Sequence, residues 1–461
     1  MRNSNIIPKQ YRWAILLVIA TLLLITPLFL REMPFNDLTY ERIKVQDQGK
    51  LNFYTEDTLV KGGRVLVITP YDLLVMLLKD IPKITLILPL IFGLLSVILF
   101  KFFLKEFNVS ENRRFFIVLL FILAPAFIFT FSLNNYYSLV LLLNFLGLFL
   151  FIKGKTRLSL TVYTILVFFG VFDFLMSLLI LFLLDQKLKK GIIKKALIPI
   201  LVFAGYLVFI IFKGGIFIPK LTATLNGVLA DIGPLGGISI FALILAVMGW
   251  GHNWRKNKKA LAVLFLVLII TIFYARASFF LFPLIAILSA SGLTILLSKQ
   301  WSINSLKTFT VLIFLLGILF SVISYETSAL TENPTAKIVQ GLEFLKESSS
   351  ETDLVLTHYS RGLWVEVFAN RSVLLDSNFG GITDYEERLK DMESVFHTYD
   401  MRIVREILNK HNIKYVVVDS ELYQGLVWEK SDQELLHLMT DKDTFNKIYS
   451  NSEITIWEFK G

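Results

Sequence analysis

The chain has 461 residues, of which 55% are hydrophobic and 18% charged. This apolar share exceeds that of soluble domains and is typical of a protein embedded in a membrane. The absence of cysteine excludes disulfides and thiolate metal sites. The net charge of +9 comes from short basic clusters between apolar runs, which is the pattern of cytoplasmic membrane loops and not of a nucleic-acid-binding surface.

The first apolar run covers residues 12–30 and ends without a small-x-small cleavage site, so we predict a retained span with a cytoplasmic N-terminus. A long, highly charged loop follows over residues 31–82. Further apolar runs of about 20 residues, each long enough for one crossing, then flank the basic stretch KEFNVSENRR and the polar corner SLNNYY. The lysine and arginine bias places both the opening loop and this corner outside the cell.

The run over residues 158–184 has basic segments on both sides, KGKTR before it and DQKLKKGIIKK after it. One helix cannot begin and end on the same side of a membrane. At 1.5 Å per residue the run is roughly 40 Å long, so we predict a hairpin of two short helices that turns near GVFDF. A single long tilted helix is the alternative, and it would invert every later segment.

The remaining apolar runs bring the total to about 11 crossings and place the ARAS corner outside. Residues 326–461 differ, because stretches with helical and strand periodicity alternate. We therefore predict a polytopic α-helical membrane domain over residues 1–325, followed by an extracytoplasmic α/β domain with a small mixed sheet over residues 326–461.

The polar residues that these assignments place outside are the candidates for chemistry. Asp37 either caps a helix at the membrane surface or acts as a base. Arg276 either snorkels at the end of a span or clamps a lipid phosphate. Asp173 either caps the hairpin or binds a ligand. Asn134, Asn135 and Tyr136 of the SLNNYY corner either satisfy a turn or bind a sugar. The remaining external candidates, from the opening loop, are Glu41, Asp57 and Arg64.

Several enzyme classes are excluded by missing motifs. The chain has no GxxxxGK[ST] loop, no HExxH and no GxSxG. Its five histidines are scattered, with four in the tail, which argues against a zinc site.

The opening loop resembles the first external loop of GT-C fold glycosyltransferases, closest to the oligosaccharyltransferase catalytic subunit and its archaeal and bacterial relatives. Those proteins place an Asp after the first span, then an aromatic residue, a Gly, an acidic patch, a "GR" and a Pro-aromatic pair. The matching residues here are Asp37, Tyr40, Gly49, Asp57, Gly63, Arg64, Pro70 and Tyr71.

Residues 352–379, TDLVLTHYSRGLWVEVFANRSVLLDSNF, are similar to the segment that carries the WWDYG signature in that family. The scaffold residues match, but His358, Tyr359, Ser360, Arg361 and Gly362 stand where the signature would be. Asn134 and Asn135 stand where oligosaccharyltransferases carry acidic metal ligands. The segment RASFFLFPLIAILSASGL resembles the span whose arginine contacts the lipid-linked donor.

The resemblance implies a membrane glycosyltransferase that moves a sugar from a polyprenyl (dolichyl-type) phosphate donor to a glycan, lipid or protein acceptor outside the cell, with inversion. It implies Asp37 as the base, and Arg276 and Arg64 as ligands of the donor phosphate. No metal is required by this donor class, although Mg²⁺ or Mn²⁺ is compatible with it. The residues implied in substrate binding are Tyr40, Glu41, Asp57, Asn134, Asn135, Tyr136, Asp173, His358 and Arg361.

Three other functions remain open. The departures from WWDYG and from the acidic pair fit a non-catalytic GT-C relative in surface-glycan assembly. Protein glycosylation of the oligosaccharyltransferase type is a second option. A flippase or transporter is the third, but such proteins carry polar residues at mid-membrane depth and often internal repeats.

Overall fold

The computed structural model describes residues 11–30, 37–48, 54–81, 83–188, 196–214, 229, 237–273, 278–331, 334–382, 384–428 and 434–461. The chain divides into two compact units. Unit 1 comprises Met1–Arg31, Thr69–Phe209 and Lys220–Glu332, and unit 2 comprises Glu32–Ile68, Ile210–Pro219 and Asn333–Gly461.

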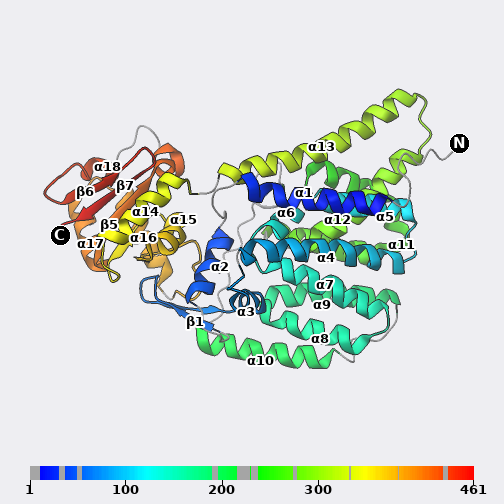
Figure 1. Ribbon diagram of the computed structural model, residues 1–461, viewed down its shortest axis with the longest axis horizontal. Helices are drawn as coiled ribbons and strands as arrows, with labels where there is room; N and C mark the ends of the chain where they lie inside the picture. Colours follow the sequence, from blue (N-terminus) through cyan, green and yellow to red (C-terminus); the bar gives the residue numbers. More distant parts are fainter. Residues whose placement is uncertain are drawn as a thin grey trace. The chain divides into compact units, whose positions relative to one another are not determined.

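Unit 1 is built from apolar helices (Figure 1). They are α1 (Arg12–Leu30), α3 (Pro70–Leu77), α4 (Ile84–Glu106), α5 (Glu111–Ile122), α6 (Pro125–Ser132), α7 (Tyr137–Ile152), α8 (Thr156–Leu166), the 3-10 turn η1 (Val167–Phe169), α9 (Val171–Leu188), α10 (Leu197–Gly214, whose last residues belong to unit 2), α11 (Ile240–Phe273), α12 (Ser278–Ser298) and α13 (Asn304–Thr331).

Among the described residues, three helices are long and apolar enough to cross a membrane: Ile84–Glu106, Ser278–Ser298 and Asn304–Thr327. Helices α5 and α6 are a fourth span if counted together, although Pro125 begins α6 and the pair bends by 62°. The chain is thus a multi-pass membrane protein, but the prediction of about 11 crossings is not confirmed. Shorter apolar helices and bends account for the difference, because a hydropathy count reads an apolar run as one straight span.

Residues 158–184 form two helices, α8 and α9, which meet at Gly170. The predicted break near GVFDF is therefore confirmed. By contrast, the apolar runs before and after the basic stretch RKNKK, which the total of about 11 crossings counts as two spans, lie within the single 34-residue helix α11. Lysine and arginine favour helix, and no proline interrupts the sequence there, so a basic cluster did not end the helix.

Helices α11 and α12 cross in close contact through two glycines. A Cβ atom at Gly249 would lie 2.0 Å from the carbonyl oxygen of Leu288, and one at Gly292 would lie 2.0 Å from that of Leu245. Only glycine allows this approach of two backbones, which is a common device in membrane helix packing.

Unit 2 contains a five-stranded mixed sheet with the order β4-β3-β5-β7-β6. Strands β3 and β4, and β3 and β5, are parallel, while β7 is antiparallel to β5 and β6. Its elements are α2 (Asp37–Gln48), β1 (Tyr54–Asp57), β2 (Arg64–Val67), α14 (Ala336–Ser348), β3 (Leu354–Leu356), α15 (Tyr359–Trp364), the π-helix η5 (Val365–Ala369), β4 (Ser372–Val373), α16 (Tyr385–Phe396), α17 (Met401–His411), β5 (Ile413–Asp419), the π-helical turn η6 (Leu422–Leu426), α18 (Glu434–Leu438), β6 (Phe445–Ser450) and β7 (Ile454–Phe459). The predicted α/β tail with a small mixed sheet is confirmed.

Alternate residues of β5 point to opposite faces of the sheet, as the two-residue period of a strand requires. Val416 and Val418 join a core with α16 and α17, whereas Tyr415 and Val417 join a core with α14 and η5. The sheet is therefore covered by helices on both faces (Figure 1).

The hairpin of β1 and β2 extends this sheet at its β4 edge. Lys61 donates its backbone N–H to the carbonyl of Val373 at 2.9 Å, and Val373 donates to the carbonyl of Leu59 at 2.9 Å. The loop that follows the first apolar helix thus belongs to the same compact unit as the tail. It also covers a sheet edge that would otherwise present unpaired backbone groups.

Candidate functional site

A polar corner of unit 1 gathers the chain before α3 and the turn between α6 and α7. Tyr71, in the first turn of α3, donates a hydrogen bond of 2.7 Å from its hydroxyl to the side-chain oxygen of Asn134. The N-terminus of α3 is closed by a capping box, in which Thr69 and Asp72 bond to each other's backbone N–H. Tyr71 is therefore held rigidly, and it fixes Asn134, which sequence reasoning had singled out.

The next two residues of this corner differ in their surroundings. Asn135 is buried and donates from its amide to the carbonyl of Phe129 at 3.3 Å, while its Oδ1 accepts no hydrogen bond from the described residues. Tyr136 donates to the hydroxyl of Tyr137 at 2.9 Å, and the two rings are tilted by 32° with centroids 4.4 Å apart. The corner is thus both a turn and a buried polar site.

Aromatic rings connect this corner to the N-terminal end of α12. Tyr137 stacks on Phe279 with centroids 4.1 Å apart, and Phe129 stacks on the same ring at 5.5 Å. Arg276 lies outside the described residues, but it precedes Ser278, the first residue of α12, by two positions. The chain therefore enters α12 beside the Asn134–Tyr137 corner.

Asp173 lies in the first turn of α9 and is buried. An acid is favourable there because the positive end of the helix dipole faces it. The adjoining turn η1 reaches the same corner, since the ring of Phe169 lies 6.2 Å from that of Tyr136. Four segments of unit 1 thus meet here: the start of α3, the turn before α7, the junction of α8 and α9, and the start of α12.

Unit 2 holds the candidates from the opening loop. Asp37 is the first residue of α2. Tyr40 is buried in the core of the sheet and meets Phe368 edge to face at 5.6 Å, so its ring is a packing element. Glu41 pairs with Arg42 and accepts a hydrogen bond of 3.3 Å from the amide of Asn378.

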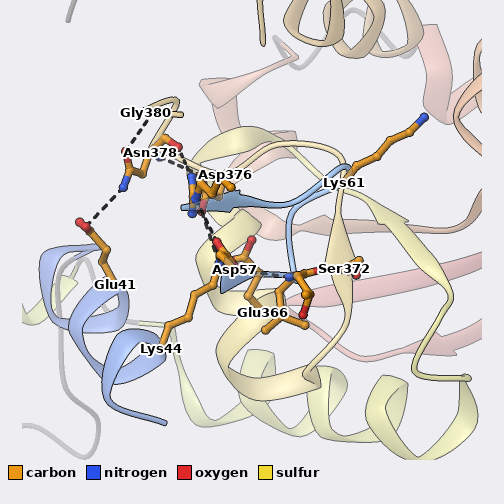
Figure 2. A network of polar contacts seen from close by, with 12 residues as sticks. Glu41, Lys44, Asp57, Lys61, Glu366, Ser372, Asp376, Asn378 and Gly380 are labelled. Carbon is orange, nitrogen blue, oxygen red and sulfur yellow. Dashed lines mark hydrogen bonds and ion pairs between the residues drawn. The ribbon is translucent and has the colours of Figure 1, made fainter. Parts of the chain in front are cut away.

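Arg64 and Asp57 belong to a buried ion network that joins the loop to the tail (Figure 2). Arg64 donates from Nε to Asp57 Oδ2 at 2.9 Å and from Nη1 to Asp376 Oδ1 at 2.8 Å. Its Nη2 bonds the other oxygen of Asp376, and Nη1 also reaches the carbonyl of Asn378. All three nitrogens of the guanidinium are engaged within unit 2, which gives Arg64 a structural role.

Two further residues complete the network, and sequence reasoning missed both. Lys44 of α2 contacts Asp57 at 2.6 Å and pairs with Glu366 of η5 (Figure 2). A buried lysine and a glutamate 322 positions apart carry no motif, and only the spacing of Lys44 from Tyr40 indicates a shared helix face. We call the following residues the buried charge cluster: Lys44, Asp57, Arg64, Glu366 and Asp376.

The charges of this cluster set its protonation. Burial lowers the affinity of Arg64 for its proton, but Asp376 and Asp57 outweigh burial and raise its pKa above the ordinary value. Burial, and then the nearby Asp376, raise the pKa of Glu366 well above its ordinary value, although Lys44 opposes them. Two cations face three carboxyl groups, so one proton on Glu366 makes the cluster electrically neutral.

The segment that replaces WWDYG forms the start of α15. His358 precedes this helix and contacts Ser360 Oγ through Nδ1 at 2.8 Å. Burial, assisted by the Arg361 guanidinium, lowers the pKa of His358 to about 4, so the imidazole is neutral at physiological pH. Arg361 donates to Asp419 at 2.7 Å, pairs with Glu421 and lies over the ring of Trp364.

Gly362 of α15 lies too close to the backbone of a neighbouring segment for any side chain. A Cβ atom there would lie 2.5 Å from the carbonyl oxygen of Leu375 and 2.7 Å from Cα of Asp376. Helix α15 therefore packs directly on the backbone that presents Asp376.

Among the residues that the structure describes, no group of three or more His, Asp or Glu side chains is arranged to hold a metal ion. Asn134 and Asn135 carry neutral amides.

An apolar helical unit joined to a mixed α/β unit, with polar side chains gathered at helix ends, is the architecture of GT-C fold membrane glycosyltransferases, and this chain has that fold. It is similar to the oligosaccharyltransferase of Archaeoglobus fulgidus in its apo form, with a TM-score of 0.57, 14% identity, and coverage of 95% of this chain and 73% of that one. It is also similar to ArnT of Cupriavidus metallidurans bound to undecaprenyl phosphate, with a TM-score of 0.53, 11% identity, and coverage of 97% of this chain and 98% of that one.

A further structure shows the Archaeoglobus enzyme with an inhibitory peptide and a dolichol-phosphate, at a TM-score of 0.54 and 13% identity, over 90% of this chain and 70% of that one. The same oligosaccharyltransferase has also been solved with zinc and sulfate. No family model and no curated protein matches the chain by sequence.

Proposed function

We propose that the protein is a GT-C type glycosyltransferase that transfers a sugar from a polyprenyl-phosphate donor to an acceptor at the extracytoplasmic face of the membrane. The observation that carries this proposal is the stack of Tyr137 on Phe279, because it brings the start of α12, which follows Arg276 by two positions in the sequence, beside the buried amides of Asn134 and Asn135. The whole-chain likeness to two glycosyltransferases supports it.

The reaction is an inverting displacement. The acceptor hydroxyl or amine attacks the anomeric carbon while the bond from that carbon to the donor phosphate breaks. Asp37 accepts the proton of the acceptor, and Arg276 stabilises the negative charge on the departing polyprenyl phosphate. Asp37 is the first residue of α2.

The donor is a lipid of the class that similar structures contain, undecaprenyl phosphate in one and dolichol-phosphate in another. The amide of Asn135, whose Oδ1 accepts nothing from the described residues, and the tyrosines beside it are suited to hold a sugar. Asp173 lies at the same corner. We retain residues 1–325 as the membrane domain, with the loop 31–82 carrying the base, and residues 326–461 as an extracytoplasmic domain that binds the acceptor through His358.

Arg64 is less suited to hold the donor phosphate than Arg276, since its three guanidinium nitrogens already bond within unit 2. Asp57 is occupied in the same network. We therefore propose Arg276 as the principal phosphate ligand.

A transfer assay tests this proposal. Purified protein in liposomes is given radiolabelled sugars on undecaprenyl and dolichyl phosphate, with glycan, lipid and sequon-peptide acceptors. Asp37→Asn should lower kcat by at least about 100-fold, because general base catalysis contributes that much. Arg276→Ala should lower kcat and raise the donor KM.

Matched controls lie on α2 and just after α12. Asp47→Asn changes an exposed acid of α2, and Lys299→Ala removes an exposed cation just beyond the far end of α12. Both should transfer sugar at the wild-type rate. Wild-type rates for Asp37→Asn and Arg276→Ala would refute the assigned roles, and no transfer by the wild type with any donor would favour a non-catalytic GT-C relative.

A further inference from the structure

The buried charge cluster connects the helix that begins at the proposed base to the tail. The side chains of its members are at most 2% exposed, and they come from α2, β1, β2, η5 and the segment after β4. Two of its contacts span more than 300 residues of sequence. Such a cluster is costly to desolvate, and buried ionic groups of this kind are better at fixing one arrangement than at adding stability.

Lys44 is the only member of the cluster on α2. It lies four residues after Tyr40, so both occupy one face of the helix, and both are buried against the tail. Tyr40 packs there against the ring of Phe368. The contacts of Lys44 are directional, because its ammonium is held between Asp57 at 2.6 Å and Glu366.

Glu366 is presented by a π-helical turn, η5, which interrupts the helical path after α15. Such wide turns are frequent at functional sites because they redirect a side chain. Its Oε2 accepts from Lys44, whereas its buried Oε1 accepts no hydrogen bond from the described residues. A neutral carboxyl and a glutamine amide both offer an acceptor oxygen at this position.

We propose that Lys44 and Glu366 are positioning residues, whose buried contact fixes the axial position and rotation of α2 on the tail and thereby the place of Asp37. Asp37 is seven residues before Lys44, which is two helical turns or about 10 Å along the axis. A small rotation of α2 at Lys44 therefore displaces its first residue. This inference rests on the proposed role of Asp37, and it adds the residues that hold that base in place.

The test must separate positioning from folding. Lys44→Met alone leaves an uncompensated carboxylate, so we pair it with Lys44→Met/Asp57→Asn, which keeps Arg64 matched to Asp376 and Glu366 neutral. Glu366→Leu removes the acceptor that η5 offers to Lys44 and leaves Asp57 in place, whereas Glu366→Gln retains an acceptor oxygen. Lys337→Met, which alters an exposed surface pair with Glu453, is the control.

We expect Lys44→Met/Asp57→Asn and Glu366→Leu to lower kcat by about 10- to 100-fold with the donor KM unchanged, since displacement of a catalytic group by about 1 Å has that effect. Glu366→Gln should restore at least half of the wild-type kcat, and Lys337→Met should match the wild type. A simple stability defect would lower the amount of folded protein. It would not lower kcat of the folded protein at an unchanged donor KM, and Glu366→Gln would not restore kcat.

A distance measurement makes the inference independent of catalysis. The chain has no cysteine, so spin labels attach only at introduced positions. Labels at Asp47→Cys on α2 and Glu343→Cys on α14, both exposed, report the placement of α2 within unit 2. The label–label distance distribution should be narrow in the wild type and in Glu366→Gln, and broadened or shifted in Lys44→Met/Asp57→Asn and Glu366→Leu.

Unchanged distances together with a wild-type kcat in the two disrupting variants would overturn the inference. If Asp37→Asn is fully active while the distances broaden as expected, the assignment of the base is wrong and only the structural part of the inference survives.

Discussion

Arg64 and Asp376, which are 312 positions apart in the sequence, form a bidentate ion pair inside unit 2, with Arg64 Nη1 donating to Asp376 Oδ1 at 2.8 Å. The pair joins the loop after the first apolar helix to the segment after β4. Both side chains are fully buried. Arg64 of the GR element in the opening loop therefore forms ion pairs in the interior of unit 2.

Arg64→Ala should destabilise the protein by about 3–5 kcal/mol, because it leaves Asp57 and Asp376 buried without their main cation. Thermal unfolding followed by tryptophan fluorescence in detergent should show a Tm lower by at least about 5 °C. Arg402→Ala, at a guanidinium that is exposed in a similar pair with Asp400, should leave Tm unchanged. A wild-type Tm for Arg64→Ala would show that the pair is dispensable.

Glu366→Gln should make the protein more stable at neutral pH. A carboxyl whose folded pKa is raised keeps its proton when folded, whereas the unfolded chain loses it above the ordinary value of 4.5. The wild type therefore loses stability as pH rises from 4.5 towards the folded pKa, and glutamine does not. When Tm is measured from pH 4.5 to 8, the Tm of the variant should rise relative to the Tm of the wild type as the pH increases. If the Tm of the variant fell relative to that of the wild type over this pH range, Glu366 would be ionised in the folded protein.

His358→Gln tests a group whose pKa is lowered by folding, so its stability should change with pH in the opposite direction. Burial lowers the pKa of His358 to about 4. Below pH 6.5 the unfolded chain therefore binds a proton at this residue, whereas the folded chain does not. The stability contributed by the neutral imidazole is complete above pH 6.5 and is lost as pH falls towards 4. The Tm of the wild type should therefore fall more steeply than that of His358→Gln between pH 6.5 and 4. Parallel curves would show that the imidazole is solvated.

Phe279→Ala should weaken donor use without unfolding unit 1. The Phe279 ring stacks between Tyr137 and Phe129, and it follows Arg276 by three residues. Loss of the stack should raise the donor KM by about 10-fold, because the start of α12, which follows the proposed phosphate ligand in the sequence, loses its contact with the Asn134–Tyr137 corner. Phe309→Ala, at an exposed ring of α13, is the matched control. Equal donor KM values in the two variants would disconnect the stack from the donor site.

Sugar transfer should continue in excess EDTA. Asn134 offers a neutral amide that is already bonded to Tyr71, and hard divalent cations prefer carboxylates. Transfer rates are compared after chelation and after addition of Mg²⁺, Mn²⁺ or Zn²⁺. Complete loss in EDTA with recovery on Mn²⁺ would place a metal in the mechanism.

The membrane character, the break between α8 and α9 and the α/β tail were all predictable from the sequence. Each depends on local information: the apolar content of a run, the charges at its ends, or the period of its apolar residues. The count of about 11 crossings stays a prediction, because Pro125 bends one apolar run, α11 continues through a basic cluster, and three helices of the described residues are long and apolar enough to cross a membrane.

The order of residues in the opening loop pointed to Asp37, Asp57 and Arg64, but it did not distinguish their roles. Only the tertiary structure showed that Asp57 and Arg64 are buried ion partners and that Lys44 and Glu366 belong with them. The reason is physical: a charge is recognised as structural only by the opposite charge that meets it, and here those partners lie about 300 residues further along the chain.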